Sequence, residues 1–178
     1  GNTGDGLWIA GDQSHDNRVL GNFVGINRDG KAALHNTGAG VQISGGAHRN
    51  IVGMTANQGN LIGGNAAAGV LITGEGTDQN VVIDNVIGLD ADEKAAIGNQ
   101  YGVEIRAGAQ ENKVGEATIG AQNTIAGNRS HGVYIYGSET ISNVVLGNFI
   151  GTNENGLVDY LLGNRGNGIF IVNQSTDT

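Results

Sequence analysis

Apolar and polar positions alternate in six short segments spread along the chain. Each segment opens with a glycine and carries apolar residues one and three positions later, as in Gly132-Val133-Tyr134-Ile135. Because side chains of a strand point alternately to opposite faces, each segment predicts a short strand with one buried face. The other five segments open at Gly6, Gly40, Gly69, Gly102 and Gly168.

Asparagines recur in three columns between these segments. The first column follows each opening glycine by ten or eleven residues, and a valine or isoleucine stands two positions after every member of the first two columns. The first column is Asn17, Asn50, Asn80, Asn112 and Asn143; the second is Asn22, Asn60, Asn85, Asn123 and Asn148; the third is Asn36, Asn65, Asn99, Asn128 and Asn164.

Columns that return in the same order five times predict a solenoid, in which each repeat is one turn, here called a rung, with three short strands and three corners. Asparagine tolerates the left-handed backbone of sharp corners, and identical asparagines on stacked rungs can form amide ladders. We therefore expect residues 1–178 to form one all-β domain of about five full rungs plus a partial one. Neither end carries an evident polar cap, so we expect an excised segment of a longer repeat array.

Insertions alternate between two corners of the predicted solenoid. Rungs one, three and five lengthen the path from the second to the third asparagine, whereas rungs two and four lengthen the path from the first to the second. The true period is thus a pair of rungs, 63 residues from Gly6 to Gly69 and again from Gly69 to Gly132. Loops of each type should stack along their own edge of the rod.

Composition narrows the function classes. The chain has 33 glycines, no proline and no cysteine, which removes disulfides, thiol catalysis and cysteine-based zinc sites. A formal net charge of −8, with the basic residues scattered singly, opposes nucleic-acid binding. No apolar run approaches the roughly 18 residues that predict a membrane span, so we expect no membrane insertion.

The repeated phrase, for example GNFIGTNENG, GGAHRNIVG and GNLIGGN, resembles the right-handed parallel β-helix repeat of the pectin-lyase-like superfamily. It is most similar to Gly/Asn-rich arrays in large secreted or surface bacterial proteins, and the resemblance covers about residues 2–172. It implies a right-handed parallel β-helix and an extracellular or cell-surface location. The superfamily holds lyases, hydrolases, epimerases, adhesins and inert spacers, so the fold alone assigns no activity.

The best candidate for chemistry lies on the outer face of the glycine-led strands. Stacking would place Glu104 and Arg106 beside Tyr134 and Tyr136 on the next rung. Aromatic rings and charged groups on a flat sheet could hold a sugar, and we name these four residues as a candidate carbohydrate site. The simpler interpretation is a cross-strand ladder with a Glu–Arg pair. No catalytic residue is predicted, because a lone Glu lacks the second carboxylate that glycosidases use.

Acidic loops occupy the same insertion on alternate rungs. Asp29, Asp90 and Asp92 are weak candidates for calcium, whose ligands are oxygen atoms. The number of carboxylates differs between the loops, and residues of this kind are ordinary in turns. The prediction is therefore no cofactor and no metal site, with calcium as the alternative.

These features favour a non-catalytic structural or adhesive β-helix segment of a larger exported protein, with weak polysaccharide binding. The first alternative is a polysaccharide lyase or glycoside hydrolase whose site is partly outside this chain. The second is an engineered or excised repeat module. The uncapped end rungs also predict end-to-end self-association.

Overall fold

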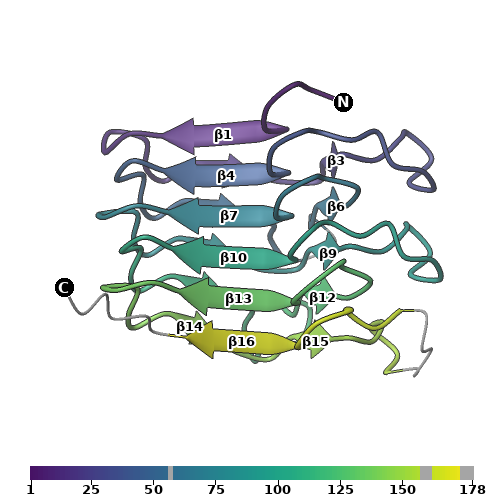
Figure 1. Ribbon diagram of the computed structural model, residues 1–178. Coiled ribbons are helices and arrows are strands. Elements are labelled where there is room, and N and C mark those ends of the chain that lie inside the picture. Colours follow the sequence, from purple (N-terminus) through teal and green to yellow (C-terminus); the bar gives the residue numbers. More distant parts are fainter. Residues whose placement is uncertain (56–57, 157–161, 173–178) are drawn as a thin grey trace.

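The computed structural model describes residues 1–55, 58–156 and 162–172, and all regular secondary structure in these ranges is β. The strands form three parallel sheets, called A, B and C (Figure 1). Sheet A contains β1 (Leu7–Ala10), β4 (Val41–Ser44), β7 (Val70–Thr73), β10 (Val103–Arg106), β13 (Val133–Tyr136) and β16 (Ile169–Val172). Sheet B contains β2 (Arg18–Val19), β5 (Ile51–Val52), β8 (Val81–Val82), β11 (Lys113–Val114) and β14 (Val144–Val145). Sheet C contains β3 (Phe23–Val24), β6 (Leu61–Ile62), β9 (Val86–Ile87), β12 (Thr124–Ile125) and β15 (Phe149–Ile150).

Each strand pairs with its counterpart on the next rung. In sheet A, Val70 lies between Val41 and Val103 in one unbroken parallel register. Successive rungs therefore stack directly, which confirms the predicted all-β parallel solenoid of about five rungs with three strands each (Figure 1). The described residues contain no helix that is long and apolar enough to cross a membrane.

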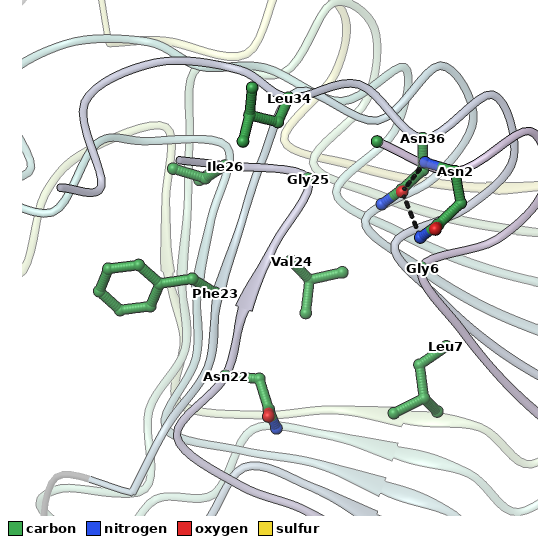
Figure 2. A pocket seen from close by; sticks show the side chains of 11 residues that line it. Asn2, Gly6, Leu7, Asn22, Phe23, Val24, Gly25, Ile26, Leu34 and Asn36 are labelled. Carbon is green, nitrogen blue, oxygen red and sulfur yellow. Dashed lines mark hydrogen bonds between the residues drawn. The ribbon is translucent and has the colours of Figure 1, made fainter. Parts of the chain in front are cut away.

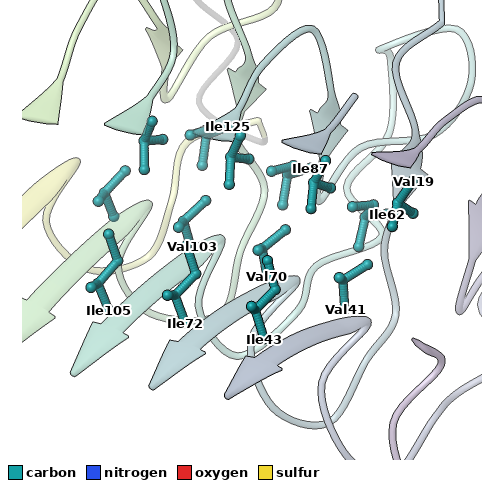
Figure 3. Packing of buried hydrophobic residues seen from close by; sticks show 14 of the residues in the cluster. Val19, Val41, Ile43, Ile62, Val70, Ile72, Ile87, Val103, Ile105 and Ile125 are labelled. Atoms are coloured by element: carbon teal, nitrogen blue, oxygen red, sulfur yellow. The ribbon is translucent and has the colours of Figure 1, made fainter. Parts of the chain in front are cut away.

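One continuous apolar core fills the inside of the solenoid. The two apolar residues of each of the first five sheet A strands lie in this core, and so do the apolar residues two positions after each asparagine of the first two columns (Figure 3). Ile43, Ile72 and Ile105 are completely buried in consecutive stacked strands. The valine and isoleucine columns thus form the core that their alternation predicted, since burial of such side chains is the main favourable contribution to folding.

All three asparagine columns form hydrogen-bonded ladders at the corners. Asn80 is typical, because both its backbone N–H and its Nδ2 donate to Oδ1 of Asn112 on the next rung, at 2.9 and 3.0 Å. Its Oδ1 accepts the same pair of bonds from Asn50, and its Nδ2 also donates to the carbonyl of Ala47. Asn2 extends the third ladder by bonding to Asn36. The predicted ladders are confirmed, and they satisfy buried backbone and side-chain groups together.

Opening glycines are required by close packing between rungs. A Cβ on Gly102 would lie 2.4 Å from both the carbonyl oxygen of Gly132 and Cγ2 of Ile125. The glycine before the second asparagine column has a different role, since Gly21 and Gly147 have φ of 64° and 70°. Asp84 occupies the same place on the third rung with φ of 58°, so this substitution keeps the corner geometry at the cost of a left-handed aspartate.

The insertions of rungs one and three form stacked loops, as their spacing predicts. Figure 1 shows the loops that follow β3 and β9 projecting from the same side of the solenoid. The loop around Gly30 contacts the loop around Asp92, because the Ala91 N–H donates to the Gly30 carbonyl at 3.0 Å and Lys31 pairs with Asp92. Loops 61 residues apart in sequence therefore support each other across the intervening rung.

Candidate functional site

The sheet A candidate residues lie together as predicted. Glu104 is paired with Tyr134, and Arg106 with Tyr136, in the register of β10 and β13. The Tyr136 hydroxyl donates to Oε1 of Glu104 at 3.0 Å and accepts from Nη1 of Arg106 at 3.2 Å. Nε of Arg106 also lies 3.4 Å from the same Glu104 oxygen. The acid, the cation and one tyrosine form a closed network.

Burial decides what this network can do. Glu104 is only 6% exposed, whereas 41% of the Arg106 side chain is accessible. Burial lowers the pKa of Arg106, but the charge of Glu104 and the bond to Tyr136 outweigh it and the pKa is raised. Burial also raises the pKa of the Tyr136 hydroxyl. Glu104 is therefore held as an internal ion-pair partner, and Arg106 is the charged group that a ligand could reach.

Three further rings extend the candidate site. Tyr101, His131 and Phe170 join Tyr134 in a cluster whose ring centroids lie 4.9–5.9 Å apart. Phe170 is in register with Tyr134 in the next strand. The sequence pattern missed Tyr101 and His131, which directly precede opening glycines. Tyr134 and Phe170 stack with an interplanar angle of 3°. Ring faces that stack on each other are not open to a sugar, so the cluster offers mainly hydroxyl groups and ring edges.

Two of the acidic loop residues, Asp90 and Asp92, have partners within the loops. Asp90 is 5% exposed, and its Oδ1 accepts the backbone N–H groups of Lys94 and Ala95 within its own loop. Lys31 lies against both Asp90 and Asp92, which holds the pKa of Asp92 below its usual value. Asp29 lies in the neighbouring loop, and no cluster of three metal-binding side chains occurs among the described residues. These contacts favour the interpretation of these residues as turn and loop-stacking groups.

Sheet C forms the floor of a groove that sequence reasoning missed. Two adjoining hollows of about 470 and 320 Å³ share Asp84, Val86 and Glu154. Glu93 and Phe149 line the larger hollow. Glu93 and Glu154 come from the loops of odd rungs, and Ile119 to Gln122 from a loop of an even rung, so both loop types border this groove.

Two carboxylates in the groove resist ionisation. Burial raises the pKa of Asp84, although backbone N–H groups of Gln58 and Gly59 oppose the shift. Burial likewise raises the pKa of Glu93, and the nearby charges of Glu154 and Asp90 add to it. Oδ2 of Asp84 is buried and has no hydrogen-bond partner in the described part of the chain. Carboxyl groups of this kind can hold or transfer a proton.

A further hollow of about 320 Å³ is an exposed cross-section of the core (Figure 2). It is lined by the inward-facing Leu7 and Val24 of the first rung and by ladder residues Asn2, Asn22 and Asn36. In Figure 2 the amide of Asn36 bonds to Asn2 at one side of this hollow. These residues of the hollow are therefore the core and ladder residues of the first rung.

No family model, curated protein or solved structure matches this chain.

Proposed function

We propose that this chain is a non-catalytic structural segment of a larger exported protein, in which it acts as a stiff spine. The single observation behind this proposal is the uninterrupted asparagine ladders, which run with the in-register sheets through every rung. A rung in this arrangement cannot tilt or slip without breaking buried hydrogen bonds at all three corners. A rod of this construction holds its ends at a fixed separation.

The three-sheet architecture with corner ladders supports membership of the right-handed parallel β-helix repeats of the pectin-lyase-like superfamily. On this proposal the chain belongs to a Gly/Asn-rich array of a secreted or surface protein. The net charge of −8 and the polar loops give such a rod a well-hydrated surface. Stacking of end rungs between copies would extend the rod.

An adhesive role on sheet A is part of this proposal. The Arg106 side chain is 41% accessible, and the half-buried rings of Tyr101 and Tyr134 pack 5.3 Å apart on the outer side of sheet A. Such groups bind sugar hydroxyls or uronate carboxylates weakly when no deep pocket encloses the ligand. We therefore expect polysaccharide binding in the millimolar range and without turnover.

A second candidate function is cleavage of a polysaccharide in the sheet C groove. The specific observation that favours it is the pair Asp84 and Glu93, two carboxyl groups with raised pKa in one groove bordered by both loop types. A protonated and an ionised carboxyl group are the usual requirement for glycoside hydrolysis. The buried and unpartnered Oδ2 of Asp84 would then hold a proton.

A binding and turnover screen on acidic and neutral polysaccharides separates these functions. The spine proposal predicts no new reducing ends and no unsaturated products, with weak binding that Tyr134→Ala reduces. Turnover that is lost in Glu93→Gln and kept in Tyr134→Ala would overturn the spine proposal in favour of the groove. Calcium is included and omitted in parallel, so that any dependence on the acidic loops is detected.

A further inference from the structure

A separate groove of about 290 Å³ runs along the third corner of the solenoid. Ala33 and Ala96, from the loops of rungs one and three, line it together with the backbone of Gly98 and Gly127. Arg129 and Arg165 are the charged residues that line it. A ligand in this groove would meet methyl groups, exposed peptide backbone and two guanidinium groups.

The two arginines occupy equivalent positions on neighbouring rungs. Each directly follows a third-column asparagine, and Asn128 donates from its backbone and from Nδ2 to Oδ1 of Asn164. The Arg165 N–H also donates to the Asn128 carbonyl at 3.0 Å. The ladder therefore fixes Arg129 and Arg165 side by side, at the spacing of adjacent parallel strands.

Neither guanidinium has a counter-charge in the described part of the chain. Both residues are exposed, and no carboxylate forms an ion pair with either one. This contrasts with four other basic residues that do pair with acids, namely Lys31, Arg49, Arg106 and Lys113. Two unpaired cations on adjacent rungs repel each other, and a bound anion would offset this repulsion.

We propose that this groove binds an oxyanion, namely a carboxylate, sulfate or phosphate group, between Arg129 and Arg165. Guanidinium groups present paired N–H donors that match such oxygens, and two of them can share one anion. Ala33, Ala96, Gly98 and Gly127 are small, so no bulky side chain of these residues fills the groove beside the two arginines. The volume suits one anionic group or one residue of an anionic polymer rather than a whole larger ligand.

The first test is a titration of the intact chain with sodium sulfate at constant ionic strength, followed by the backbone amide signals of Gly98 and Gly127. Saturable shifts of both signals are expected. The double variant Arg129→Gln/Arg165→Gln should lose saturation, and each single variant should bind about tenfold more weakly. Arg28→Gln removes the same charge from another exposed, unpaired arginine and should bind sulfate as the unaltered chain does. Absent saturation, or equal saturation in the double variant, would overturn the proposal.

Parallel titrations with acetate, phosphate and a short oligogalacturonate identify the source of the anion. Tighter binding of the oligomer than of acetate by at least tenfold would assign the groove to a uronate polymer. Equal affinities would assign it to a free anion.

A stability measurement adds an independent readout, because without anion Arg129→Gln should be at least as stable as the unaltered chain. Marked destabilisation would instead show a structural role for Arg129. The outcome leaves the spine proposal untouched, since that rests on the ladders.

Discussion

At the scale of single residues, asparagine is the residue that determines this structure. With the exception of Asn65, whose Oδ1 receives one donor, each buried ladder asparagine receives two donors at Oδ1. Each donates from Nδ2 to the next rung, and in most rungs also to a backbone carbonyl. No other side chain of this length offers both an acceptor and two donors. Aspartate would remove the donors and place charges in a column, and glutamine would not fit the same corner.

The ladder predicts that truncating a central asparagine lowers the free energy of unfolding more than truncating one on the first rung. In the centre of the rod, Asn80→Ala removes the acceptor of the Asn50 backbone N–H and of one Asn50 Nδ2 bond. It also removes the Nδ2 donor to the Ala47 carbonyl and to Oδ1 of Asn112. Because each buried group left unsatisfied costs about 1–3 kcal/mol, we expect a loss of roughly 3 kcal/mol in the free energy of unfolding. Asn17→Ala at the first rung should cost less, since Asn17 is exposed. Denaturant unfolding measures both, and equal losses would contradict a central role for the buried ladder.

The raised pKa of Asp84 predicts that replacing this residue by asparagine increases the stability of the chain, by an amount that depends on pH. A carboxyl group whose pKa is higher in the folded than in the unfolded chain reduces stability as pH rises through that interval. Asp84→Asn should therefore unfold at a higher temperature at pH 7, with the gain shrinking as pH falls towards about 4. Asparagine also tolerates the left-handed backbone at this position.

The variant Asp92→Asn should change the stability in the opposite direction. Lys31 lowers the pKa of Asp92, so its ionised form stabilises the folded chain above its unfolded pKa. The variant should lose stability at pH 7 and match the unaltered chain in acid. Thermal unfolding between pH 3 and 7 measures both variants, and the same sign for the two would refute this electrostatic description.

At the scale of elements, the strands are very short, and the corners fix their register. Strands of two residues in sheets B and C could not hold a register alone, but each lies between corners whose asparagines are bonded to the next rung. The opening glycines let adjacent rungs approach at the start of every sheet A strand. Strand, ladder and glycine therefore act as one repeated unit.

Two glycine variants distinguish the two reasons for glycine in this fold, namely close packing between rungs and a left-handed backbone. Gly102→Ala would place a methyl group 2.4 Å from the Gly132 carbonyl oxygen, so we expect a loss of about 3 kcal/mol, the upper end for overpacking. Gly21→Ala has open space around its Cβ but a φ of 64°, which predicts a smaller loss of about 1 kcal/mol. Calorimetric unfolding of both checks this order. A larger loss in Gly21→Ala would mean that backbone conformation, rather than rung spacing, selects glycine.

The repeating elements could be predicted from the sequence because every rung buries the same apolar positions and bonds the same asparagines. The columns of Asn80 and Ile72 gave the corner ladders and the core, and the pairing of Glu104 with Tyr134 followed from the register. The groove at Asp84 and Glu93 could not be predicted in this way. It depends on how two insertions of different length fold. Glu93 has the same left-handed backbone as Gly30 and Gly156 at the equivalent positions of the repeat, but it alone of the three places a side chain in the groove.

At the scale of the whole molecule, each rung is stabilised by its neighbours. Ile105, in the fourth strand of sheet A, is completely buried, whereas the equivalent Ile171 in β16 is 64% exposed. An isoleucine at the same register position is thus buried where rungs stack on both of its sides. Stability should rise with the number of rungs until the array is long, as in other solenoids.

Hydrogen exchange of the asparagine side-chain amides tests the spine account most directly. Both Nδ2 protons of Asn80 are bonded in the core, one to Asn112 and one to Ala47. If the ladders hold the rungs rigidly, the Nδ2 protons of Asn80, Asn85 and Asn99 should exchange as slowly as the backbone amides of the central strands. Those of Asn17 should exchange faster. Rapid exchange of the central side chains, with protected backbone amides, would show that the corners open independently and would contradict a stiff spine.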